Sequence, residues 1–133
     1  MMEKQSVFIL AIVSTIFFFG LPKAKAYYYF MDGETHDVDY AIDDYVGVHN
    51  KSASGHGFGK TTVNFLSGAS ISGSLSIWDD SEVNILGGQF SQYVTLYHSG
   101  KLNISGGSIA WSVESNFEAD GVHITVLGGE IRD

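Results

Sequence analysis

The sequence contains no cysteine, so neither a disulfide nor a thiolate metal site stabilises this chain. Basic residues are also scarce: 7 lysines and arginines stand against 15 aspartates and glutamates, giving a formal net charge of −8. Nucleic-acid binding depends on clustered lysine and arginine side chains that displace counterions from phosphates. We therefore expect no nucleic-acid partner. The 133 residues allow one domain at most, which must be stabilised by packing and backbone hydrogen bonds.

The sequence also lacks an apolar run of the roughly 20 residues needed to cross a bilayer as a helix. The longest run, Val7 to Gly20, follows Lys4 and precedes Ala24-Lys25-Ala26, a small-x-small pattern that a signal peptidase accepts. Residues 1–26 are predicted to be a signal peptide cleaved after Ala26, with an uncleaved anchor as the alternative. We expect a secreted or cell-surface protein with no membrane span after cleavage.

An internal repeat dominates the remaining chain. The phrase "LNISGGSI" (102–109) is close to "VNFLSGASI" (63–71), "VNILGGQF" (83–90) and "VHITVLGGEI" (122–131). Apolar residues alternate within each phrase, which is typical of strands, and glycine, serine and aspartate follow at turn positions. Repetition of one pattern in one order favours parallel stacking over hairpins. The predicted fold is all-β, a single-stranded parallel β-helix with about 19-residue coils and about four coils over 45–133.

Stacking would align equivalent residues of successive coils in columns. One outward column is expected to be an asparagine ladder, Asn64, Asn84 and Asn103, followed by His123, in which side-chain amides bond from coil to coil. The inward columns are expected to be Val46, Leu75, Val94, Val113; Val48, Ile77, Leu96; Val63, Val83, Leu102, Val122; Phe65, Ile85, Ile104, Ile124; and Ile71, Phe90, Ile109, Ile131. A lone coil would not fold, because burial of its apolar residues requires neighbours on both sides.

The two ends of this stack differ in sequence. The aromatic and acidic segment 27–44 breaks the repeat and is predicted to be an N-terminal cap. No equivalent follows the last unit of the given sequence, which stops at "GGEIRD" (128–133). An uncapped end exposes strand edges and apolar side chains. We expect that further coils, another molecule or self-association through the solenoid ends covers it.

The repeats of this chain resemble a known group of proteins. The phrase N-[IV]-S-G-G-x-[IV] in "SEVNILGGQF" (81–90) and "GKLNISGGSI" (100–109) is similar to the short repeats of secreted bacterial β-solenoid proteins. Many of those are exosortase-sorted, and related repeats occur in adhesin-like passengers with pectin-lyase-like β-helices. The resemblance covers about Tyr45 to Ile131 and implies a right-handed solenoid. The Pro-Glu-Pro anchor signal and the pectate-lyase catalytic cluster have no match in this sequence, so neither anchoring nor activity is carried over.

Six carboxylates in the segment 27–44 raise the question of calcium. They are Asp32, Glu34, Asp37, Asp39, Asp43 and Asp44. Ca²⁺ binds six to eight oxygens, but neither the EF-hand order nor the calcium-binding solenoid repeat is present. A solvated acidic cap is the preferred interpretation, calcium is the weaker one, and no cofactor is expected. The five histidines do not recur at a ligand spacing, so no metal site is predicted.

No catalytic residue is predicted either. Asp79 and Asp80 are a carboxylate pair of the kind that hydrolyses glycosides, but adjacent residues in a turn do not face each other across a cleft. The glycines of "SASGHGFGK" (52–60), with His56, do not complete a phosphate loop. This segment is interpreted as an excursion from its coil, where binding often resides.

One outward column carries rings: His49, Trp78 and Tyr97, followed by Asn116. Aromatic faces can stack on sugars, but rings on adjacent strands also stabilise a sheet by stacking on each other. The sequence thus leaves two hypotheses. The first is an exported, non-enzymatic repeat protein with a structural, surface or adhesin-like role. The alternative is a carbohydrate-binding or polysaccharide-active β-helix protein that uses these rings and the loop 52–60.

Overall fold

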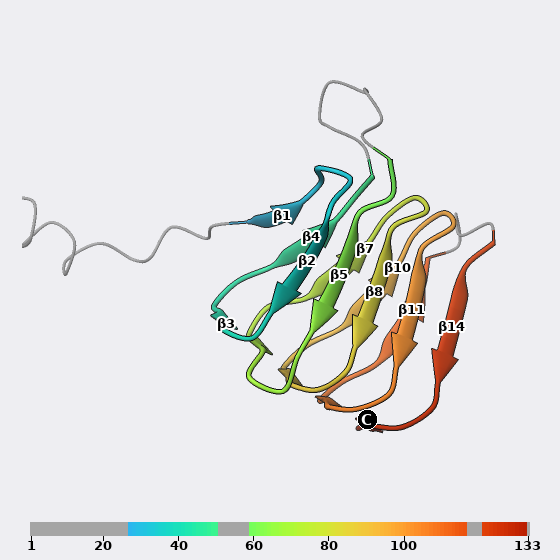
Figure 1. The fold of residues 1–133 in the computed structure, drawn as a ribbon. Coiled ribbons are helices and arrows are strands. Elements are labelled where there is room, and N and C mark those ends of the chain that lie inside the picture. The colour runs from blue at the N-terminus through green and yellow to red at the C-terminus, as the bar shows by residue number, and fades with distance from the viewer. Residues whose placement is uncertain (1–26, 51–58, 117–120, 133) are drawn as a thin grey trace, which may run out of the picture.

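The computed structural model describes residues 27–50, 59–116 and 121–132, and in them the chain forms a parallel β-solenoid of five coils (Figure 1). The predicted signal peptide and most of the loop 52–60, including His56, lie outside the described residues. No helix among the described residues is long and apolar enough to cross a membrane. The predicted fold class is confirmed.

Each coil contributes one short strand to each of three parallel sheets. Sheet A contains β1 (Tyr28–Phe30), β4 (Val46–Val48), β7 (Leu75–Ile77), β10 (Val94–Leu96) and β13 (Val113–Ser115). Sheet B contains β2 (Thr35–Val38), β5 (Thr62–Phe65), β8 (Glu82–Ile85), β11 (Lys101–Ile104) and β14 (His123–Val126). Sheet C contains β3 (Ala41–Ile42), β6 (Ser70–Ile71), β9 (Gln89–Phe90), β12 (Ser108–Ile109) and β15 (Glu130–Ile131). Figure 1 shows the coils side by side, with sheet B facing the viewer.

The core is a stack of apolar columns between the sheets. Leu75, Val94 and Val113 lie 19 residues apart and occupy successive rungs, and Ile85 pairs with Ile104. The inward residues of the three middle coils are at most 2 % exposed. Alternation along each strand therefore places every second side chain in the core, as predicted.

The segment 27–44 does not break the repeat, contrary to the expected cap. Its strands β1, β2 and β3 pair in parallel with β4, β5 and β6, so it forms the first coil and the solenoid has five coils rather than four. The repeat is disguised because rings replace aliphatic residues: Tyr28, Phe30 and His36 occupy columns that hold Val46, Val48 and Val63 in the next coil.

The predicted register of the last coil is wrong by two residues. Leu102 pairs with Ile124 rather than Val122, and Ile104 pairs with Val126 rather than Ile124. Seven residues separate β13 from β14, against four between β7 and β8 and between β10 and β11, so β14 begins three residues later than in those coils. The number of residues between the end of the sheet B strand and the following Gly-Gly turn is the same in β8, β11 and β14. The Gly-Gly turn, and not the first apolar-x-apolar pair, therefore sets the register.

The first and the last of the five described coils bury their inward residues to different extents. At the first coil Phe30, Val38 and Ile42 are 7 %, 1 % and 6 % exposed, and the hydroxyl of Tyr28 bonds that of Tyr40 across the coil at 3.2 Å. This bond raises the pKa of Tyr40 to about 12. At the last coil the inward residues Ile124, Val126 and Ile131 are 44 %, 53 % and 43 % exposed.

The repeated Gly-Gly turn between sheets B and C has a steric cause. A Cβ on Gly106 would lie 2.4 Å from the carbonyl oxygen of Leu86 in the previous coil. Gly107 has a φ of +75°, a backbone conformation that residues other than glycine rarely adopt. The first glycine thus permits the close approach of two coils, and the second permits the turn itself.

Candidate functional site

The predicted ring column is present at the corner that follows sheet A. The rings of Trp78 and Tyr97 are stacked with centroids 3.7 Å apart and an interplanar angle of 1°. His49 stacks on Trp78 from the preceding coil, with centroids 5.4 Å apart and an angle of 9°. On the other side of His49 lies the ring of Tyr29, in an edge-to-face contact with the two ring centroids 5.6 Å apart. The three residues predicted from the sequence are therefore brought together.

The stacking leaves little ring face free for a ligand. Both faces of Trp78 are covered, by His49 and by Tyr97, and all three rings are half-buried. Trp78 Nε1 and His49 Nε2 are buried and have no hydrogen-bond partner among the described residues, and burial lowers the pKa of His49. Sugar rings stack on open aromatic faces. This geometry favours the stabilising interpretation of the column, and glycan binding by His49, Trp78 and Tyr97 stays a prediction.

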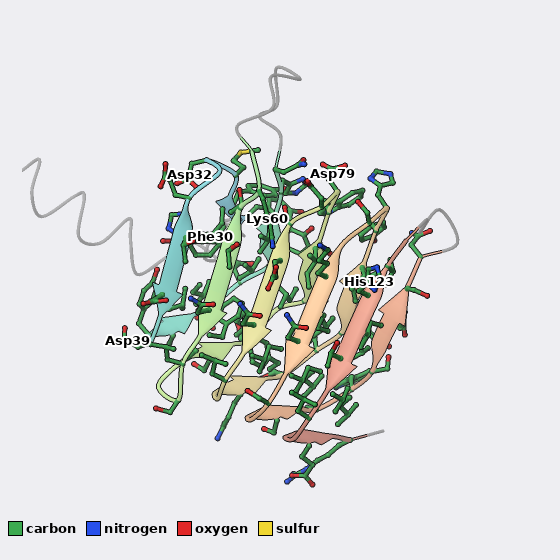
Figure 2. All side chains as sticks on the ribbon, turned by 45° about the vertical axis from the view of Figure 1, so that its right-hand side comes forward. Phe30, Asp32, Asp39, Lys60, Asp79 and His123 are labelled. Atoms are coloured by element: carbon green, nitrogen blue, oxygen red, sulfur yellow. The ribbon has the colours of Figure 1, made fainter. Side chains whose placement is uncertain are left out.

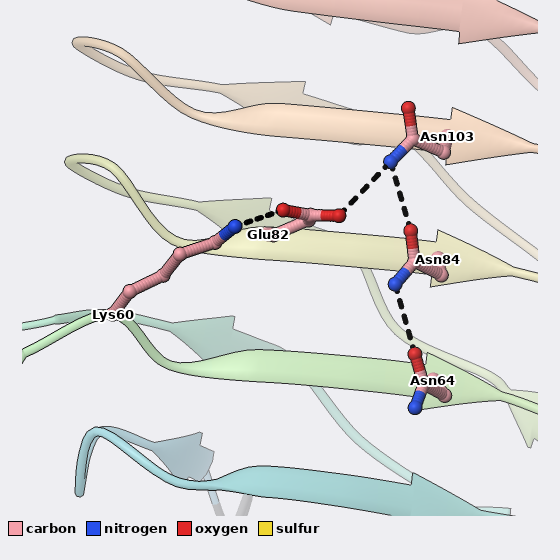
Figure 3. Close-up of polar contacts among 5 residues, drawn as sticks. All are labelled: Lys60, Asn64, Glu82, Asn84 and Asn103. Atoms are coloured by element: carbon pink, nitrogen blue, oxygen red, sulfur yellow. Dashed lines mark hydrogen bonds and ion pairs between the residues drawn. The ribbon is translucent and has the colours of Figure 1, made fainter.

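The asparagine ladder on the outer face of sheet B is also present (Figure 3). Asn103 Nδ2 donates to Asn84 Oδ1 at 2.8 Å, and Asn84 Nδ2 donates to Asn64 Oδ1 at 2.9 Å. Beyond the prediction, Asn64 Nδ2 donates to the carboxylate of Asp37 at 2.8 Å. At the other end the neighbour of Asn103 is Thr125 and not His123, because of the register of β14.

The ladder has a direction and a charged flank. Every amide in it donates toward the first coil, where the Asp37 carboxylate accepts. Glu82 lies beside the ladder, accepts a second bond from Asn103 at 3.2 Å and pairs with Lys60 (Figure 3). The outer face of sheet B thus uses its polar groups to hold successive coils together.

The acidic residues of the first coil do not converge on one point. Asp32 and Asp39 lie at opposite ends of β2 in Figure 2. Asp32 Oδ1 bonds His36 Nε2 at 2.8 Å, which lowers the pKa of Asp32, while Asp37 accepts from Asn64. Asp43 accepts from Ser72 Oγ at 2.9 Å. In the part of the chain that the structure describes, no group of three histidine or acidic side chains is placed to hold a metal.

Asp79 and Asp80 lie in the turn between sheets A and B, as their sequence suggested. Asp79 has a φ of 59°, and its carboxylate bonds Nδ1 of His98 at 3.0 Å. His98 occupies the equivalent turn one coil on and has a φ of 53°. Asp80 accepts a bond from Asn50. The two carboxylates therefore serve turn geometry and contacts between coils.

A second group of rings was missed from the sequence. One position directly precedes the first inward residue of sheet A in each coil, and it holds Tyr27, Tyr45, Ser74, Tyr93 and Ser112 in turn. Backbone hydrogen bonds between neighbouring coils show this alignment: they run from Tyr28 N to Tyr45 O, from Val46 N to Ser74 O and from Leu75 N to Tyr93 O. Tyr27, Tyr29, Tyr93 and Trp111 are 61 %, 47 %, 37 % and 52 % exposed. A signal existed: tyrosine recurs directly before the first apolar residue of the strand.

Neither a family model, a curated protein nor a solved structure matches this chain.

Proposed function

We propose that this chain is an exported, non-enzymatic repeat protein with a structural or adhesin-like role at the cell surface or outside the cell. The observation that supports this role is the ladder Asp37–Asn64–Asn84–Asn103, whose bonds of 2.8 to 2.9 Å join four coils. Groups that act on a substrate converge on a point. Here the polar side chains of sheet B repeat at the height of each coil and bond each other, which builds a stiff, regular face.

Carbohydrate chemistry is the second candidate, and a different observation favours it. Exposed aromatic rings lie in sheet A or directly before its strands, at Tyr29, Tyr27 and Tyr93. These rings are suited to holding a sugar polymer by stacking, and stacking alone cleaves no glycosidic bond, which requires a positioned acid and base. Binding rather than hydrolysis is therefore the form of this candidate that we retain.

Export is tested by expressing the full chain in a bacterium with an active Sec pathway. The expected result is a product in the periplasm or the medium that begins at Tyr27, read by N-terminal sequencing. Replacing Ala24 and Ala26 with glutamine should leave the signal segment attached, since signal peptidase accepts small residues at these positions. A cytoplasmic product beginning at Met1 would refute the export part of the proposal.

The non-enzymatic part is tested separately on the purified chain. It is incubated with arabinoxylan, polygalacturonate and laminarin, and new reducing ends are measured. No release above a buffer control is expected. Release that persists in the wild type and disappears after Asp79→Asn or Asp80→Asn would refute the proposal, because it would assign chemistry to the turn carboxylates.

A further inference from the structure

Four rings just before strands of sheet A, together with Tyr29 within β1, form a surface that is here called the tyrosine edge: Tyr27, Tyr29, Tyr45, Tyr93 and Trp111. Tyr27, Tyr29 and Tyr45 contact one another with centroids 5.4 to 6.2 Å apart. Tyr93 and Trp111 form a second group, 5.1 Å apart and edge to face. The edge runs along the solenoid axis, because its members belong to the first, second and fourth coils and the turn that follows.

The tyrosine edge differs from the His49–Trp78–Tyr97 column in how its rings are used. Its contacts are edge to face or loosely stacked at 6.2 Å, whereas Trp78 and Tyr97 are parallel at 3.7 Å. Four of its five rings are at least 37 % exposed. These four side chains are therefore accessible to an incoming molecule, and stacking on a sugar requires accessible aromatic rings.

The chemistry of the edge selects the kind of partner. Tyrosine and tryptophan have an apolar face and a polar group, so they remain exposed at lower cost than aliphatic residues do. The rung between the two groups is polar, and there Ser74 Oγ donates to Gln92 Oε1 at 3.1 Å. The chain as a whole has a net charge of −8, which repels polyanions. An uncharged polymer with apolar faces and hydroxyl edges satisfies all three conditions.

The spacing of the two ring groups also fits a polymer. Tyr45 and Tyr93 lie two rungs apart, which corresponds to about 10 Å along the axis at the usual strand spacing. A linear sugar chain laid along the axis would meet a ring, a polar rung and a second ring in turn. We propose that the tyrosine edge binds an uncharged polysaccharide along the solenoid axis. This inference deepens the proposed adhesin-like role by naming what the surface holds.

The test is affinity electrophoresis of the purified chain in native gels that contain hydroxyethylcellulose, arabinoxylan or laminarin, with alginate as an anionic polymer. We expect at least one neutral polymer to slow the chain and alginate not to. The double variant Tyr93→Ala, Trp111→Ala should bind about tenfold more weakly, because two stacking contacts are lost. Its fold is checked by circular dichroism, and Tyr93→Phe, Trp111→Phe should retain binding because the rings remain.

The matched control is Leu86→Ala. Leu86 is an apolar residue that is 52 % exposed and lies between β8 and β9, at the corner between sheets B and C, so its loss should leave binding unchanged. No retardation by any neutral polymer would overturn the proposal, as would equal binding by the wild type and the alanine double variant. Binding lost after Tyr97→Leu but kept after Trp111→Leu would also overturn it by assigning the sugar to the other column. N-terminal sequencing of the exported chain does not depend on binding, so failure of the export proposal is read separately.

Discussion

Replacing Gly106 with alanine should destabilise the solenoid although the residue lies in a turn on the surface. The new Cβ would lie 2.4 Å from Leu86 O, whereas ordinary contacts begin at 3.4 Å. The two coils would have to separate locally by about 1 Å at a strand spacing of about 4.8 Å. Such overpacking costs typically 1–3 kcal/mol, and backbone atoms cannot rotate away, so we expect a loss of about 2–3 kcal/mol in the free energy of unfolding.

Two other glycines separate this steric cost from the cost of backbone conformation. Gly121 has a φ of +81°, but the nearest atom to its Cβ would be 3.9 Å away. Gly121→Ala should therefore show the conformational cost alone, about 1 kcal/mol. Gly107 combines a φ of +75° with carbonyl oxygens at 2.8 Å, so Gly107→Ala should lose about 3–4 kcal/mol.

Urea unfolding followed by circular dichroism measures all three variants on one scale. The expected order of stability is wild type, Gly121→Ala, Gly106→Ala and Gly107→Ala. A Gly106→Ala variant as stable as the wild type would refute the reasoning, because it would mean that the coils are not held at the separation described. A Gly121→Ala loss as large as that of Gly106→Ala would show that conformation, and not contact between coils, sets the cost.

Three further predictions concern the ladder, the ring column and the last described coil. Asn84→Ala removes two ladder bonds and should cost about 1–3 kcal/mol in urea unfolding, whereas Thr125→Ala, beyond the last bonded rung, should cost less than about 0.5 kcal/mol. Burial lowers the pKa of His49, so the unfolded chain binds a proton more readily than the folded chain does. The free energy of unfolding should therefore be highest above about pH 6.5 and decline below it, and this part of the decline should disappear in His49→Phe. The exposed Ile124 and Val126 predict association that increases with concentration in analytical ultracentrifugation and is abolished by Ile124→Lys, Val126→Lys; a wild type that stays monomeric would contradict self-association through this end.

The middle of the fold was predictable because its residues repeat at constant length. Ile85 and Ile104, or Asn84 and Asn103, stand at the same place in units of 19 residues, so position alone fixes the partner. The first coil was missed because aromatic residues replace valine in part of its core: Tyr28 and Phe30 occupy the columns of Val46 and Val48. Pattern matching compares residue types, whereas a column needs only an apolar side chain of suitable shape.

The candidate sites were predictable to a lesser degree. Sequence order placed His49, Trp78 and Tyr97 in one column, but only coordinates show that the rings face each other and not the solvent. The tyrosine edge required knowledge that residues 27–44 form a coil, since Tyr27 aligns with Tyr45 only then. An error in the fold at one end therefore concealed a surface feature that continues to the fourth coil.

The central claim is that five coils stack in register along one axis, and pulsed electron spin resonance on paired cysteine-linked spin labels tests it most directly. The chain has no cysteine of its own, so the labels attach only at the two cysteines that are introduced. Thr35 and His123 lie four rungs apart in sheet B, and Ala41 and Glu130 lie four rungs apart in sheet C. The account predicts equal distances for the two pairs, near four strand spacings or about 19 Å. When the second label of the sheet B pair is attached at position 101 instead of position 123, the distance should shorten by one strand spacing. Clearly unequal distances for the two pairs, or no shortening with Lys101, would contradict it.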